Sequence, residues 1–134
     1  KKNIKMKPIK GQLLHIKTNK KLINNILIYK NYYIVQREDN EIVVGATLED
    51  VGFDTDLTES GKNFLEECLS DLLLERVEIS NLEQTFGFRP YADKNEPYVS
   101  LDPNNKKIIY NFGHYRYGIL TAIPSAHIVK RLVS

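Results

Sequence analysis

The strongest constraint on the fold is a change in the spacing of apolar residues near position 58. Before it, short runs rich in β-branched and aromatic residues are separated by turn residues, a pattern typical of strands. We expect strands within 11–17, 25–39 and 41–50, the second of them folded as a hairpin. After it, apolar residues recur at helical spacing, at Phe64, Leu65, Cys68, Leu69, Leu72 and Leu73.

Turns and helix ends follow from polar residues between these runs. Tight turns are expected at Lys30–Asn31 and Asp39–Asn40, and Thr58 is a suitable helix N-cap. Extended structure returns over 77–88, and a compact strand over 107–113 ends on glycine. The chain closes with a helix whose apolar face comprises Ile119, Ala122, Ile123, Ala126, Val129 and Val133.

These elements predict an α+β fold with a largely antiparallel sheet, one helix over 58–74 packed on it and a C-terminal strand–helix unit. The single cysteine, Cys68, excludes an internal disulfide framework. No two histidines have ligand spacing, so we expect no metal. No apolar run has the length of a membrane span and no signal peptide is evident, so we expect a cytoplasmic chain without membrane contact.

The charge is distributed unevenly along the chain. Nine lysines, one arginine and no acidic residue lie between Lys1 and Arg37. Such a block forms either a solvated lysine-rich surface or a face that binds a polyanion or a partner chain. No aromatic-flanked arginine or glycine-rich RNA-binding signature accompanies it, so we do not expect a nucleic-acid partner.

The segment GHYRYG, residues 113–118, joins a predicted buried strand to the last helix. The backbone amides from Gly118 to Leu120 would then form a helix N-terminus with unsatisfied donors and a positive dipole end. Such an end binds anions or electron-rich carbonyls. The alternative is an ordinary strand-to-helix turn.

Two arginines need anionic partners. Arg89 lies between Phe88 and Pro90 in the strand-like stretch TFGFRP, and an unpaired charge beside a buried strand is costly. Its planar guanidinium suits a ligand carboxylate held by two hydrogen bonds. The alternative is a structural ion pair with one of three nearby acids, Glu83, Asp93 and Glu96. Arg116, within GHYRYG, likewise needs an anionic partner.

Three separated segments resemble the C-terminal part of the FAD-dependent D-amino acid oxidase family, and most of all the glycine oxidases of the thiazole pathway. They are YIVQREDNEIVVGATLEDVGFD at 33–54, GFRP at 87–90 and GHYRYGILTAIPSA at 113–126. The segment 7–17 is similar to the point where the chain of that family re-enters its substrate domain. The motifs occur in the order of the family and cover nearly the whole chain.

The resemblance implies a role for each motif. Arg89 would bind the substrate carboxylate, Tyr33 would lie over the substrate, and Arg116 would also lie close to it. The flavin would be contacted by His114, Tyr115, Arg116, Tyr117, Gly118, Ile119 and Leu120. The implied reaction is oxidation of glycine, sarcosine or a small D-amino acid by hydride transfer to FAD, with no residue acting as acid or base. Arg89, Tyr33 and the amides after residue 117 would then enclose one hollow.

The chain departs from the family pattern in two motifs beside that hollow. Thr85 and Phe86 stand where the family often has Trp-Ala, and Tyr117 stands where it usually has asparagine. Asn31 lies where glycine oxidases can carry a histidine. These departures leave the size of the preferred substrate open, and the electron acceptor and a homo-oligomer are open as well.

None of the seven glycines forms the Gly-x-Gly-x-x-Gly fingerprint of a dinucleotide-binding unit. We therefore expect a C-terminal fragment in which 1–106 is the substrate-binding sheet region and 107–134 returns to an FAD-binding domain that is absent. Such a fragment would bind FAD weakly and would be inactive alone. A competing hypothesis from another class is a non-catalytic binding or assembly module that uses the basic N-terminal face.

Overall fold

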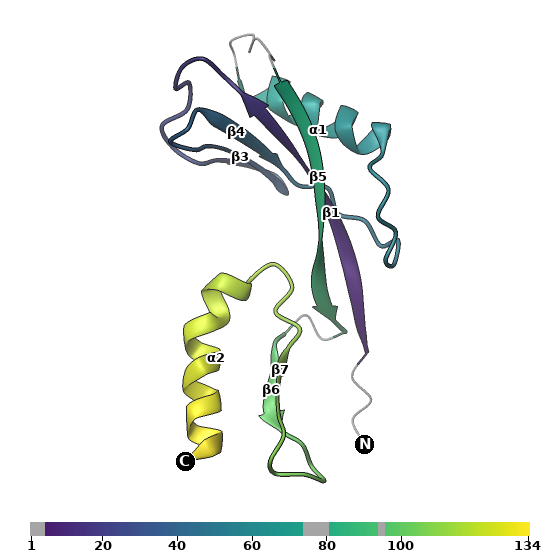
Figure 1. Ribbon diagram of the computed structural model, residues 1–134, viewed down its shortest axis with the longest axis vertical. Helices are drawn as coiled ribbons and strands as arrows, with labels where there is room; N and C mark the ends of the chain where they lie inside the picture. The colour runs from purple at the N-terminus through teal and green to yellow at the C-terminus, as the bar shows by residue number, and fades with distance from the viewer. Residues whose placement is uncertain (1–4, 74–80, 94–95) are drawn as a thin grey trace. The chain divides into compact units, whose positions relative to one another are not determined.

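The computed structural model describes residues 5–73, 81–93 and 96–134 (Figure 1). It divides into two compact units, Lys10–Phe88 and Lys1–Ile9 with Arg89–Ser134, and each is described by itself. The elements in chain order are β1 (Met6–Lys17), β2 (Leu27–Tyr29), β3 (Tyr32–Gln36), β4 (Glu41–Gly45), α1 (Glu59–Leu72), β5 (Asn81–Ala92), β6 (Tyr98–Leu101), β7 (Ile109–Phe112) and α2 (Gly118–Val133).

A five-stranded sheet with the order β2-β3-β4-β1-β5 organises the first unit. The pairs β2–β3, β3–β4 and β1–β4 are antiparallel. Both predicted turns are present, and each uses a left-handed residue, Lys30 with φ 52° and Asn40 with φ 60°. The predicted α+β class with a largely antiparallel sheet is confirmed.

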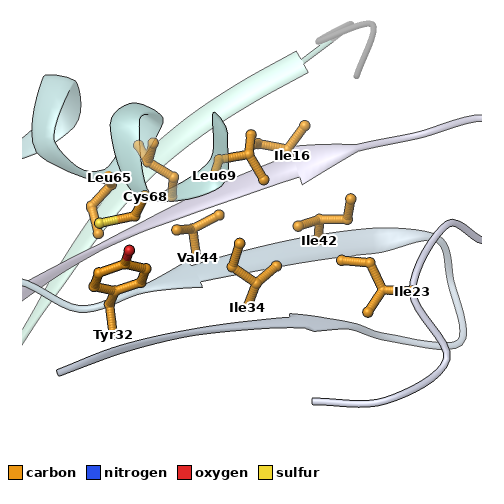
Figure 2. Close-up of a cluster of buried hydrophobic side chains, with 10 residues drawn as sticks. Ile16, Ile23, Tyr32, Ile34, Ile42, Val44, Leu65, Cys68 and Leu69 are labelled. Carbon is orange, nitrogen blue, oxygen red and sulfur yellow. The ribbon is translucent and has the colours of Figure 1, made fainter. Parts of the chain in front are cut away.

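The helix α1 covers one face of this sheet, as the apolar spacing predicts. Thr58 caps its N-terminus by accepting a hydrogen bond of 3.1 Å from the amide of Gly61. The buried face of α1 comprises Leu65, Cys68 and Leu69, which point at the sheet (Figure 2). On the sheet side the core consists of Leu14, Ile16, Ile23, Tyr32, Ile34, Ile42 and Val44.

The second unit contains the antiparallel hairpin β6–β7 and the helix α2, which contacts both strands. The strand predicted over 107–113 is observed as β7, whereas β6 was not predicted. The extended structure predicted over 77–88 is observed from Asn81 as β5, and 77–80 lie outside the described residues. The hairpin β6–β7 lies on both sides of residue 106. The division there between a substrate-binding part and a part that returns to an FAD-binding domain stays a prediction.

The apolar face predicted for the last helix is present but largely exposed. Ile119 is 94% exposed, Ile123 72% and Val133 69%, while the buried residue of α2 is Ser125. Pro124 lies inside the helix and does not mark its start. In the described ranges, no helix combines the length and the apolar character that a membrane crossing requires.

Candidate functional site

The two motifs that carry the expected chemistry meet through their backbones in the second unit. The amide of Tyr115 donates a hydrogen bond of 3.1 Å to the carbonyl of Pro90, which directly follows Arg89. Tyr91 forms an isolated antiparallel bridge with His114. The rings of Tyr91 and Tyr115 pack edge to face with centroids 5.2 Å apart. The strand end that carries Arg89 is therefore attached to the start of the GHYRYG segment.

Gly113 makes this close approach possible. Its φ of +79° lies in the left-handed region, and a Cβ added there would lie 2.8 Å from Cβ of Ala92. Any other residue would be strained and would also push β5 away. The turn continues through Tyr115, which has φ 49°.

The ring of His114 is held at both nitrogens. Nε2 lies 2.8 Å from Oδ1 of Asn111, and Nδ1 lies 2.7 Å from Oγ1 of Thr121. The single hydroxyl proton of Thr121 is donated to the carbonyl of Tyr117 at 2.8 Å. The imidazole is thus fixed in orientation beside the first turn of α2.

The N-terminus of α2 presents unsatisfied donors, as predicted. The backbone amide of Thr121 donates a hydrogen bond of 2.9 Å to the carbonyl of Tyr117, which is the first intrahelical bond of α2. The amides of Gly118, Ile119 and Leu120 precede it. The N-cap, Tyr117, makes no side-chain capping bond, and the first turn has no acidic residue. Residues 116–120 are all exposed. These donors fit an electron-rich group such as the carbonyl edge of a flavin.

Tyr33 belongs to the first unit. It is half-buried on β3, directly opposite Gly45 on β4. The phenol carbon Cζ and the hydroxyl oxygen lie 2.9 Å from the point where a Cβ of residue 45 would be. The ring therefore lies over Gly45.

The structure thus brings together Arg89 and residues 114–120 within one compact unit, while Tyr33 lies in the other. The convergence of Tyr33 with these residues on one ligand stays a prediction. Arg89 is half-buried and Arg116 is exposed.

The lysine-rich N-terminal segment is not uniformly solvated. The side chain of Lys10 has no exposed surface, and its Nζ lies 2.8 Å from the carbonyl oxygen of Asp56, 3.2 Å from Oδ2 of Asp54 and 3.4 Å from Oε2 of Glu49. Burial opposes its charge, but the two carboxylates outweigh this and raise the pKa of Lys10. Lys17 is exposed and pairs with Asp39 at 2.6 Å. Part of the basic block therefore serves the fold.

A family assignment follows from comparison with known proteins. The family model of the FAD-dependent oxidoreductases called DAO matches residues 1–132. Because this match spans nearly the whole chain, the chain belongs to that family, whose members are FAD-dependent oxidoreductases.

Its similar relatives include glycine oxidases. The glycine oxidase of Pseudomonas aeruginosa is 30% identical over 127 residues, which are 95% of this chain and 35% of the relative. The bifunctional protein ThiO/ThiG of Nostoc sp. is 33% identical over 94% of this chain and 20% of its own length. The crystal structure of glycine oxidase from Geobacillus kaustophilus superposes with a TM-score of 0.84, at 27% identity over 96% of this chain and 35% of that one. The chain thus spans about a third of the length of the two glycine oxidases and a fifth of the length of the bifunctional relative.

Sequence reasoning did not single out three residues that position candidate side chains within their own units. Asn111 and Thr121 hold His114, but an asparagine and a threonine near a histidine are too common to signal this. Gly45 did carry a signal, because glycine inside a strand often marks the close approach of another group.

Proposed function

We propose that this chain is the substrate-binding part of an FAD-dependent oxidase of glycine or another small amino acid. The observation that carries the proposal is the hydrogen bond between Pro90 and Tyr115, which ties the arginine-bearing strand end to the helix start. A carboxylate ligand and the carbonyl edge of a flavin both need donors, and these two segments supply them within one unit.

Arg89 binds the substrate carboxylate in this proposal. Its fork-shaped guanidinium can donate two parallel hydrogen bonds, which fixes the orientation of the amino acid as well as its position. Tyr33 lies over the bound substrate and Arg116 lies near it. Orientation of the α-hydrogen is then the main contribution of these residues to the rate.

The start of α2 binds the flavin through His114 to Leu120. The FAD supplies the two-electron oxidation, since it accepts a hydride from the α-carbon. The free amides of the first turn would stabilise negative charge on the nearby flavin edge, because they lie at the positive end of the helix dipole. The ring of His114 is preorganised there by Asn111 and Thr121.

We also propose that residues 107–134 contact the FAD-binding part of the complete protein. The support is the row of exposed apolar side chains on α2, which includes Ile119, Ile123 and Val133. A contiguous apolar surface of this kind normally lies in an interface. The relatives are about three times as long as this chain, which leaves room for such a partner.

The test compares carboxylate binding in variants of the complete FAD-loaded protein. Acetate, a carboxylate that the enzyme cannot oxidise, is titrated while the visible absorbance of the flavin is followed. Arg89→Ala should weaken binding by about 2 to 5 kcal/mol, because it removes one partner of a charged hydrogen-bonded pair. Arg89→Lys should bind acetate with intermediate affinity, because it keeps the charge and loses the fork.

Arg37→Ala is the matched control, because Arg37 is exposed and pairs with Glu41 at 2.8 Å. It should bind acetate as tightly as the unchanged protein. If Arg89→Ala also binds acetate with unchanged affinity, the role of Arg89 is wrong.

A further inference from the structure

We propose that Gly45 is a positioning residue that sets where the phenol of Tyr33 lies. The inference rests on the proposed function for the role of Tyr33 at the substrate. Gly45 on β4 lies directly between Leu13 on β1 and Tyr33 on β3 in the register of the sheet. Directly opposed residues of neighbouring strands point to the same face. Two large side chains therefore flank a position that has none.

The side chain of Tyr33 occupies the space where a side chain of residue 45 would lie. A Cβ at residue 45 would lie 2.9 Å from both Cζ and Oη of Tyr33, and it would also collide with Cδ2 of Leu13. Since Cζ and Oη form the far end of the tyrosine, the ring lies across β4 with its hydroxyl above the glycine. Non-bonded carbon atoms prefer separations of about 3.5–4.0 Å, so any other residue at 45 would displace the ring.

The φ angle of Gly45 is not among the positive values that call for a glycine. Among the described glycines, those with positive φ are Gly52 and Gly113. Gly45 lies inside a strand, where glycine is unfavourable because it has no side chain to pack. Val43, two residues earlier on the same strand and face, is a buried apolar residue. The close approach of the Leu13 side chain and the Tyr33 ring distinguishes the space around position 45.

No hydrogen bond from a described residue holds the phenol of Tyr33 in place. In the described ranges, its hydroxyl has no hydrogen-bond partner, whereas the hydroxyl of neighbouring Tyr32 lies 3.5 Å from Oδ2 of Asp71. The place of the Tyr33 phenol is therefore determined by packing over Gly45 and beside Leu13.

The test uses the complete FAD-loaded protein with acetate as the probe, followed by the visible absorbance of the flavin. Gly45→Ala should weaken acetate binding measurably, and it should lower kcat/KM with glycine roughly 10- to 100-fold, the range expected in the rate when a positioning group moves by about 1 Å. The same substitution in a Tyr33→Ala background should change binding less than about 2-fold, since no ring remains to be displaced. With glycine as substrate, kcat should fall together with kcat/KM.

A second variant tests the inference if Gly45→Ala does not fold. Gly45→Ala combined with Leu13→Ala removes the collision with leucine and leaves only the collision with the tyrosine ring. This double variant should still bind acetate measurably more weakly than Leu13→Ala alone. Equal affinity of these two proteins would overturn the inference.

The outcomes separate this inference from the proposed function. If Tyr33→Ala weakens acetate binding and Gly45→Ala does not, the proposed function stands and the positioning role of Gly45 is wrong. If Gly45→Ala weakens binding equally with and without Tyr33, the glycine acts through the backbone and the inference is also wrong. If Tyr33→Ala leaves acetate affinity unchanged, the substrate role of Tyr33 fails and the inference fails with it.

Discussion

Lys10 shows how much a single residue can differ from the behaviour of its segment. It lies in a block of lysines without acidic residues, yet it is fully buried between Glu49 and Asp54. Both acids follow β4 in the chain, so the buried ammonium ties the segment after β4 to β1. Its partners are 39 and 44 residues away, which is why spacing along the sequence gave no sign of the contact.

Lys10→Met should destabilise the first unit, because Glu49 and Asp54 would lose the cation that neutralises them. The urea midpoint should fall with an unchanged m-value. Lys21→Met is the control, since Lys21 is exposed. Equal midpoints for the two variants would show that the buried ammonium contributes nothing to stability.

At the scale of elements, the cap at the N-terminus of α1 predicts a measurable effect on stability. Thr58 accepts hydrogen bonds from the amide of Gly61 at 3.1 Å and from Nε2 of Gln12 at 2.9 Å. Thr58→Ala should lower the free energy of unfolding by about 1 kcal/mol, the usual cost of a lost N-cap. Ser70→Ala, a change at an exposed position in the last turn of α1, should be nearly neutral in the same denaturation experiment.

The turn between β7 and α2 should be equally sensitive. Gly113→Ala places an L-residue at φ +79° and a methyl group 2.8 Å from Ala92. The conformational term alone costs about 1–2 kcal/mol, and the contact adds to it. Gly87→Ala is the control for stability, because a Cβ there meets no atom within 4 Å. Indistinguishable unfolding curves for these two variants would contradict the account of this turn.

Elements with a local signal were predictable and elements defined by distant partners were not. The cap at Thr58, the spacing of Leu65 and Leu69 and the turn at Asn40 are all local, and each was anticipated correctly. The strand β6 is only four residues long, and it becomes a strand through pairing with β7. Of the candidate site, the motifs were recognisable, but the packing of Tyr33 over Gly45 depends on strand register.

At the scale of the whole molecule, several carboxylates make stability depend on pH. Hydrogen bonds from Tyr110 and the amides of Asn104 and Asn105 lower the pKa of Asp102 below its ordinary value of 3.8. The pairing with Lys17 does the same to the pKa of Asp39. At pH values between the lowered pKa of the folded state and the ordinary pKa, the unfolded state binds more protons than the folded state. These carboxylates therefore stabilise the fold at pH values above that interval.

The free energy of unfolding should therefore fall as the pH drops below about 4. Asp102→Asn should make this decline shallower, because one depressed carboxylate is removed. Denaturation curves measured at several pH values between neutrality and pH 3 give the slope directly. An identical slope in the variant would contradict the contribution of Asp102.

The central claim is that this chain binds a small amino acid against a flavin. The most direct measurement is anaerobic mixing of the complete FAD-loaded protein with glycine, sarcosine and D-alanine, following the visible absorbance of the oxidised flavin. We expect at least one of them to bleach that absorbance rapidly, and Arg89→Ala to need a far higher concentration of the same amino acid. Flavin that stays oxidised with all three would contradict the claim.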